Sequence, residues 1–144
     1  MSRSTAPTFL IVDGNNIIHA WPDLLVLHRK RRGLGHQELR RRLRDYHDLC
    51  DYRLVVVFDG KSGPQEEERD PSGFQVIYTD GASTADGVIE RLTAKYAKKF
   101  RIIVATNDLA EQNVVASFGA ETWSAELLRA TIDRSEGRWR DYLK

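Results

Sequence analysis

Phe9-Leu10-Ile11-Val12-Asp13-Gly14 is an uninterrupted apolar run that ends at an acid and a glycine. Because the run does not alternate between apolar and polar residues, it predicts a strand buried on both faces of a sheet. Similar apolar runs occupy residues 54–58, 74–78 and 102–105, and a shorter one lies at residues 121–123. We therefore predict five strands, each short and mostly apolar.

Between the predicted strands, apolar residues recur with the period of an α-helix. Leu39, Leu43 and Tyr46 lie on one stripe, and Ile89 and Leu92 lie on another. Strands that alternate with helices predict a parallel sheet, joined by right-handed crossovers and covered by helices on both faces. The expected fold class is therefore α/β, with three layers and a central, mainly parallel five-stranded sheet flanked by helices.

The segment from Gly60 to Gly73 departs from this pattern. It has no apolar period and contains two prolines and three consecutive glutamates. We expect it to form a mobile loop.

Length and composition fit one globular domain spanning residues 1–144. Hydrophobic residues make up 41% and charged residues 30% of the chain, which is ordinary for a folded domain with one core. Cys50 is the only cysteine, which excludes an internal disulfide and a zinc site built from several thiolates. No apolar stretch approaches the roughly 20 residues that span a bilayer, and the polar start does not resemble a signal peptide. We therefore expect a cytoplasmic protein with no membrane partner.

Basic residues concentrate in one segment, although the net charge is only +1. Between residues 29 and 44, Glu38 is the single acid among eight basic residues. Such a segment can neutralise successive phosphates of a nucleic acid, whereas a solvated helix face needs no such excess of one sign. The expected nucleic-acid contacts are Arg29, Lys30, Arg31, Arg32, Arg40, Arg41 and Arg44.

Acidic residues stand where the predicted strands end. Asp13, Asp59 and Asp108 close three strands, and Asp86 falls in the first turn of the helix after another. Because ligands of an open parallel sheet bind outside the carboxyl ends of its strands, these four side chains are expected to share one crevice. A single acid at such a place is often only a turn former or a helix cap, and we expect Asp80 to form a turn. Recurrence at four elements favours a common site.

Four carboxylates in one crevice repel one another, by about 4 kcal/mol per pair at 4 Å and an effective dielectric constant of 20. Bound cations would remove this repulsion, and hard oxygen ligands suit Mg²⁺ or Mn²⁺. Such ions can activate water and stabilise the leaving oxygen of a phosphodiester, so no serine, cysteine or histidine nucleophile is required. The pattern thus predicts phosphodiester hydrolysis.

Four further side chains near these acids each have two interpretations. Asn16 can orient a bound water or contact phosphate, or it can cap a helix. Glu90, one helical turn after Asp86, can act as an outer ligand or be a solvated surface residue. His19 and Trp21 can stack on a base or pack in the core and at its rim.

Four sequence blocks occur in an order that is typical of one protein family. They are Ile11-Val12-Asp13-Gly14-Asn15-Asn16 followed by Ala20-Trp21-Pro22; Val55-Val56-Val57-Phe58-Asp59; Thr84-Ala85-Asp86 running into Ile89-Glu90-Arg91-Leu92; and Val104-Ala105-Thr106-Asn107-Asp108 with Glu111-Gln112. A weaker fifth block is Gly119-Ala120 with residues 124–128. Through these blocks, which span nearly the whole chain, the sequence resembles the YacP-like proteins of the NYN branch of the PIN-like nuclease superfamily.

The resemblance implies a Rossmann-like parallel sheet, an acidic metal site and endoribonuclease activity, linked in some members to translation. Carried over by position, Asp13, Asp86 and Asp108 are the expected metal ligands for Mg²⁺ or Mn²⁺. Asp59 and Asn16 complete the expected catalytic site. RNA, including mRNA on ribosomes, is the expected partner.

The sequence therefore predicts an endoribonuclease in which metal-activated water attacks phosphorus, leaving 5′-phosphate and 3′-hydroxyl ends. One rival is a non-catalytic RNA- or ribosome-binding module that uses the basic segment 29–44. Binding that survives EDTA without cleavage would favour this rival. A magnesium phosphatase with an aspartyl nucleophile is disfavoured, because no second aspartate stands two positions after Asp13. Asn107 occupies a position where many relatives carry serine, so the choice of RNA stays open.

Overall fold

One sheet of six strands, in the order β3-β4-β2-β1-β5-β6, forms the centre of the molecule. The computed structural model describes residues 6–60, 66–69 and 71–143, without the side chains at positions 32, 66–69 and 139–143. The five predicted strands are present and run parallel: β1 (Thr8–Asp13), β2 (Arg53–Phe58), β4 (Phe74–Tyr78), β5 (Arg101–Ala105) and β6 (Glu121–Trp123). The predicted α/β fold class is confirmed.

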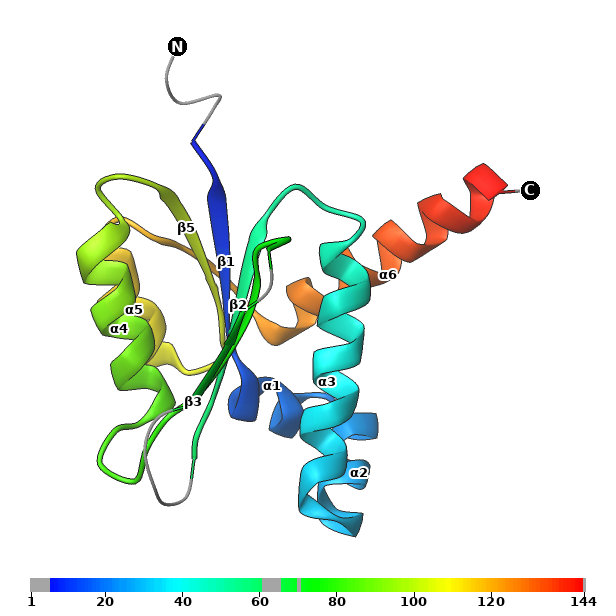
Figure 1. The fold of residues 1–144 in the computed structure, drawn as a ribbon, viewed down its shortest axis with the longest axis horizontal. Coiled ribbons are helices and arrows are strands. Elements are labelled where there is room, and N and C mark those ends of the chain that lie inside the picture. Colours follow the sequence, from blue (N-terminus) through cyan, green and yellow to red (C-terminus); the bar gives the residue numbers. More distant parts are fainter. Residues whose placement is uncertain (1–5, 61–65, 70, 144) are drawn as a thin grey trace.

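Helices cover both faces of this sheet (Figure 1). One face carries α1 (Gly14–Ala20), α2 (Pro22–Lys30), α3 (Arg32–His47) and α6 (Ala125–Leu143), and the other carries α4 (Ala85–Tyr96) and α5 (Leu109–Ser117). Within the described residues, every helix is too short or too polar to traverse a lipid bilayer.

Successive residues of β1 explain why the strands are apolar throughout. Leu10 and Val12 point into the core on the α3 side, and Ile11 points into the core on the α4 side. All three are nearly inaccessible to solvent. Leu39 and Ile89, from the two predicted helical stripes, pack into these two cores. The periodicity of the sequence therefore follows directly from burial on two sides.

The expectation of a loop from Gly60 to Gly73 was wrong in part. Residues Glu66–Arg69 form β3, an edge strand that pairs antiparallel with β4. Four successive charged residues have no apolar period, and an edge strand requires only main-chain pairing on one side. Pattern reasoning therefore does not detect this strand. Residues 61–65 and 70 of the expected loop lie outside the described residues.

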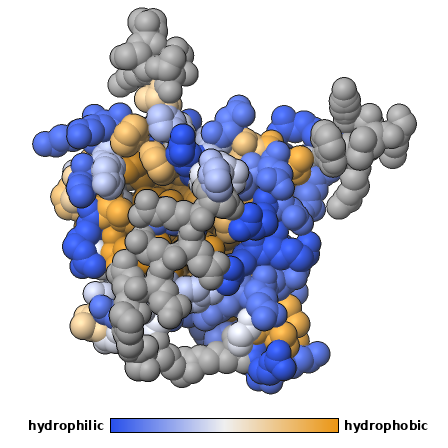
Figure 2. Space-filling model, in the orientation of Figure 1, coloured by the Kyte–Doolittle hydropathy of each residue, from blue (hydrophilic) through white to orange (hydrophobic). Residues whose placement is uncertain are grey.

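The α4 side of the sheet is covered less completely than the α3 side. A pocket of about 320 Å³ between α4 and the strands is lined in part by Ile11, Val55, Ile77 and Leu92. Apolar residues are visible in this region in Figure 2. Phe9, at the start of β1, also lines the pocket, which therefore lies away from the strand ends where the acids gather.

Candidate functional site

A cleft of about 520 Å³ opens at the carboxyl ends of the strands. Because β2, β1 and β5 are adjacent and parallel, the residues that follow them meet at one edge of the sheet. The cleft brings together the five predicted catalytic residues and four others. Its lining residues are Asp13, Asn15, Asn16, His19, Asp59, Thr84, Ala85, Asp86 and Asp108.

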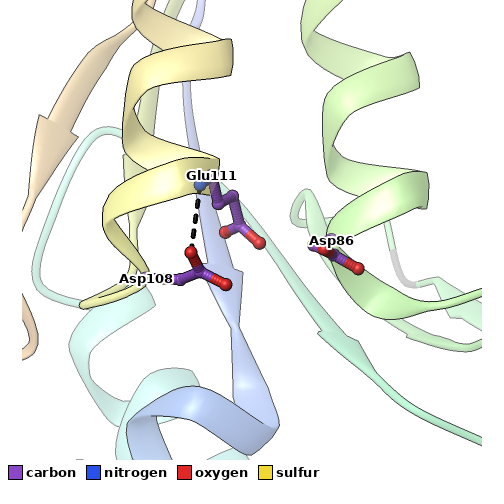
Figure 3. Close-up of side chains that lie close together, drawn as sticks. All are labelled: Asp86, Asp108 and Glu111. Atoms are coloured by element: carbon purple, nitrogen blue, oxygen red, sulfur yellow. Dashed lines mark hydrogen bonds between the residues drawn. The ribbon is translucent and has the colours of Figure 1, made fainter.

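Three carboxylates form a tighter group. One oxygen from each of Asp86, Asp108 and Glu111 lies within 4.8 Å of the others. Figure 3 shows the three groups facing a common space between α4 and α5. Mg²⁺ and Mn²⁺ prefer oxygen ligands of this kind.

Helix starts hold two of these acids in place. Asp108 is the N-cap of α5, and its side chain accepts a hydrogen bond from the main-chain N–H of Glu111 (3.1 Å). Asp86 lies in the first turn of α4, where its Oδ1 accepts from the N–H of Gly87 (3.0 Å). The partial positive charge of a helix N-terminus favours carboxylates at both places. Two helix starts from different crossovers thus present acids to each other.

Glu111 was not predicted as a site residue, although it is the most buried acid of the group at 1% exposed. Neither of its carboxylate oxygens accepts a hydrogen bond from a described residue. Burial, followed by the negative charge of Asp13, raises the pKa of Glu111 well above its ordinary value of 4.5. The Asp108-x-x-Glu111 spacing is that of a capping box, in which the glutamate side chain turns back to the helix start, so the sequence carries no signal that this glutamate is buried. Here the glutamate side chain points into the protein.

Asp13 lies deep in the cleft and is only 7% exposed. Its Oδ2 accepts a hydrogen bond from the hydroxyl of Thr106 (3.2 Å), which is itself buried. Burial raises the pKa of the Asp13 carboxyl above its usual range. Among the described side chains, no lysine or arginine pairs with Asp13 or Glu111. Two buried carboxylates without a basic partner fit a site for a divalent cation, which supplies the missing positive charge.

Asp59 and Asn16 each form a hydrogen bond to a neighbouring segment at the cleft. Asp59 is exposed, and its Oδ1 accepts a hydrogen bond from the main-chain N–H of Ala85 (2.7 Å). The side-chain oxygen of Asn16 accepts from the main-chain N–H of Asn107 (2.8 Å). Both residues lie where the sequence places them, and both hold a neighbouring segment in position.

Of the remaining residues considered from the sequence, only some lie at the cleft. His19 is exposed and lines the cleft. Trp21 is a core residue, because it is 2% exposed and its indole N–H donates to the main-chain oxygen of Ala125 (3.0 Å). Glu90 is not among the lining residues of the cleft. Asp80 forms a turn, as expected, and accepts from the N–H groups two and three positions later.

The first part of the basic segment is exposed. Arg29, Lys30 and Arg31 lie where α2 ends and α3 begins. No ion pair joins them to another side chain in the described part of the chain. The side chain of Arg32 lies outside the described residues. We refer to Arg29, Lys30 and Arg31 as the basic tip.

The second part of the basic segment is engaged within the protein. Arg41 forms ion pairs with Glu38 (2.7 Å) and Asp45 (3.0 Å). Arg40 donates to a tyrosine hydroxyl (3.0 Å), and the guanidinium of Arg44 lies over a phenylalanine ring, 4.5 Å from its centre. The sequence thus brings the expected residues to one region, but among those whose side chains the structure describes, only the three of the basic tip present their charges without such contacts.

Known proteins share this architecture. The sequence model of the YacP-like NYN domain family matches residues 10–144. The chain is 35% identical to the uncharacterized protein YacP of Bacillus subtilis (strain 168) over 130 aligned residues. The aligned region covers 87% of this chain and 76% of YacP. The crystal structure of Rae1 (YacP) from Bacillus subtilis is 32% identical, with a TM-score of 0.78 over 94% of this chain and 79% of Rae1. The structure of a Rae1 mutant matches with a TM-score of 0.76 at 31% identity, over 90% and 77% of the two chains.

A mainly parallel α/β sheet with acids gathered at its carboxyl edge agrees with the PIN-like nuclease superfamily, to which the matching NYN domain family belongs. Within that superfamily, the chain belongs to the YacP-like NYN domain family. The family assignment agrees with the sequence blocks, and Asp13, Asp86 and Asp108 of those blocks all lie at the cleft.

Proposed function

We propose that this protein is a metal-dependent endoribonuclease that hydrolyses phosphodiester bonds in cytoplasmic RNA. The observation that carries the proposal is the convergence of Asp86, Asp108 and Glu111 oxygens within 4.8 Å. Membership of the NYN family supports the same chemistry, because this family belongs to the PIN-like nucleases.

Asp86, Asp108 and Glu111 are the groups that would hold Mg²⁺ or Mn²⁺, with Asp13 beside Glu111 as a further ligand. When bound, such an ion neutralises the carboxylates, stabilises charge on the phosphodiester and lowers the pKa of water. A water molecule attacks phosphorus and the bond to the 3′-oxygen breaks. The products therefore carry 5′-phosphate and 3′-hydroxyl ends.

Asn16 orients the substrate side of the cleft. The side-chain oxygen of Asn16 accepts a hydrogen bond from the main-chain N–H of Asn107 (2.8 Å), and this contact fixes the orientation of the Asn16 side-chain amide. The Nδ2 group of Asn16 is then the donor available to a phosphate oxygen or to the attacking water. This role requires a donor, so aspartate at this position does not substitute for it.

The basic tip is the proposed contact for the RNA backbone. It lies at the end of the molecule toward which β1 and β2 run, as does the cleft (Figure 1). Its exposed charges can neutralise phosphates without breaking an ion pair within the described part of the protein. Messenger RNA on ribosomes is one substrate compatible with such non-specific backbone contacts.

A non-catalytic RNA-binding module is the second candidate function. The observation in its favour is that the basic tip is exposed and does not include any residue of the acidic cleft. In that case the acids would serve the fold alone. The two candidates differ in whether RNA is cut.

Incubation with a mixed RNA pool and Mn²⁺ distinguishes them. We expect the parent protein to cut RNA, and the Asp13→Asn variant and the parent with EDTA to leave it intact. Asp80→Asn, which removes a carboxylate from a turn outside the cleft, is the matched control and should cut like the parent. Retention of RNA without cleavage by the parent would support the binding module and refute the nuclease.

A further inference from the structure

We infer that Asp59 is a positioning residue that fixes the start of α4, and through it Asp86, opposite Asp108. The inference rests on the proposed metal site and assigns Asp59 a role apart from cation binding. Its carboxylate is exposed and does not belong to the group of three carboxylates that lie within 4.8 Å of one another. Another task must explain its place in the cleft.

The side chain of Asp59 holds the first residue of α4. Its Oδ1 accepts a hydrogen bond of 2.7 Å from the main-chain N–H of Ala85. This N–H belongs to the first turn of the helix, where main-chain donors have no partner within the helix. Ala85 is 1% exposed and directly precedes Asp86. The contact therefore ties the end of β2 to the residue next to a metal ligand.

Asp59 can hold α4 because its own main chain is fixed on both sides. Its N–H donates to the side-chain oxygen of Asn15 (2.9 Å), which belongs to α1. The next N–H, that of Gly60, donates to the hydroxyl of Thr79 (3.0 Å). A Cβ at Gly60 would lie 1.7 Å from the main-chain oxygen of Thr79, so the chain packs as closely there as glycine permits. The support for the Asp59 side chain is rigid.

The position of α4 matters because the three carboxylates come from two helices. Asp108 and Glu111 share the start of α5 and are joined by a hydrogen bond, so their relative position is set locally. Asp86 accepts from the N–H of Gly87, which fixes its carboxylate relative to α4 only. The distance between the two parts of the site therefore depends on what holds the start of α4. Asp59 is a side chain that performs this task from outside the helix.

A pair of variants separates hydrogen bonding from charge. Asp59→Asn removes the charge but keeps a side-chain oxygen that can accept from the N–H of Ala85, since asparagine and aspartate cap helix starts equally well. Asp59→Ala removes both. Asp80→Ala is the matched control, because it deletes a carboxylate that accepts main-chain N–H groups just before α4 but outside the cleft.

The measurement is Mn²⁺ affinity without RNA, from the electron paramagnetic resonance signal of free Mn²⁺. Asp59→Asn is expected to bind within about threefold of the parent, because the hydrogen bond from the N–H of Ala85 persists. Asp59→Ala is expected to bind about 10-fold or more weakly, as for loss of a group that orients a ligand. Asp80→Ala is expected to match the parent. Thermal melting verifies that each variant is folded, and Asn15→Ala, expected to weaken binding in the same direction, replaces Asp59→Ala if that variant does not fold.

Equal losses in Asp59→Asn and Asp59→Ala would overturn the inference, because they would mean that the negative charge binds the ion. Unchanged affinity in Asp59→Ala would overturn it as well. A parent that binds no Mn²⁺ refutes both the inference and the metal site. A parent that binds Mn²⁺ in the expected order but cuts no RNA refutes the nuclease function and leaves the positioning role standing.

Discussion

Asp108 and Glu111 stand one helical turn apart at the start of α5, where the N–H of Glu111 donates to the side chain of Asp108 over 3.1 Å. Asp108 thereby caps the helix, and the Glu111 side chain is left to enter the protein, where its carboxylate finds no hydrogen-bond donor among the described residues. The start of α5 thus carries a buried carboxyl group, that of Glu111, which lowers the stability of the fold when no cation is bound. Stability and metal binding are coupled at this point, which makes the site accessible to thermodynamic measurement.

Glu111→Gln should stabilise the protein in the absence of metal. Because the pKa of Glu111 is raised in the folded protein, folding at neutral pH requires its carboxyl to take up a proton. A glutamine needs no such proton, so the substitution is expected to raise the free energy of unfolding by about 1–2 kcal/mol at neutral pH in EDTA. For a chain of this size, the melting temperature should rise by about 3–6 °C. The same variant should lose most of the stabilisation that Mn²⁺ confers on the parent.

Asp133→Asn, which removes an exposed carboxylate on α6, is the control. It should change neither the stability in EDTA nor the stabilisation by Mn²⁺. A Glu111→Gln variant that melts below the parent in EDTA would contradict this account of the cluster.

The stability of the metal-free protein should fall as pH rises from about 5 to 8. The pKa values of Asp13 and Glu111 are raised in the folded protein, so folded molecules keep protons that unfolded ones release. Stability is therefore greatest below the ordinary carboxyl pKa and is lost as pH rises through the raised values. Asp23 and Glu38, whose pKa values are lowered by arginines, act in the opposite direction but only at lower pH.

Urea unfolding across this pH range in EDTA provides the test. Glu111→Gln should flatten the dependence, and saturating Mn²⁺ should flatten it in the parent. A parent that becomes more stable from pH 5 to 8 without metal would show that the buried carboxyls do not hold protons.

The basic tip should account for the salt dependence of RNA binding. Alanine at Arg29, Lys30 and Arg31 together is expected to weaken binding in EDTA and to reduce the slope of log K against log salt by about 2, the loss of three phosphate contacts on a single strand. Arg41→Ala is the matched control, because its charge is already paired with Glu38 and Asp45. An equal effect of Arg41→Ala would place the RNA along α3.

Two glycines should respond to alanine in opposite ways. Gly60→Ala places a Cβ 1.7 Å from the main-chain oxygen of Thr79 and should destabilise the fold by about 2 kcal/mol or more. Gly137 lies within α6, and a Cβ added there would meet no atom within 4 Å, so alanine should stabilise by about 0.5–1 kcal/mol. Denaturant midpoints measure both. A neutral Gly60→Ala would show that the Asp59 support is looser than described.

The sequence predicts the central sheet and the acids at its edge for one physical reason. The central strands are buried on both faces and are therefore apolar, so an acid such as Asp13 or Asp108 marks the place where the apolar run ends. Parallel neighbours then bring these ends together without any knowledge of the loops. The presence of Asp13, Asp86 and Asp108 in one cleft follows from this argument.

Glu111 and the contacts of Asp59 could not be obtained in this way. Asp108-x-x-Glu111 is equally consistent with an exposed capping box, and only the packing of α5 against the sheet shows that the glutamate is buried. The hydrogen bond from the N–H of Ala85 to Asp59 joins two residues that have both β3 and β4 between them along the chain. The position of β3 is not predicted by any apolar pattern. Ion pairs such as Arg41 with Glu38 likewise depend on side-chain directions that charge counting does not include.

The most direct test of hydrolysis at the acidic cleft is cleavage of a defined single-stranded RNA in water enriched in oxygen-18. The masses of the products are then measured by mass spectrometry. With Mn²⁺, the account predicts 5′-phosphate ends that carry one heavy oxygen, 3′-hydroxyl ends on the upstream fragments, and no products from Asp108→Asn. Cyclic phosphate ends, or cleavage that persists in EDTA or in Asp108→Asn, would contradict hydrolysis at the acidic cleft.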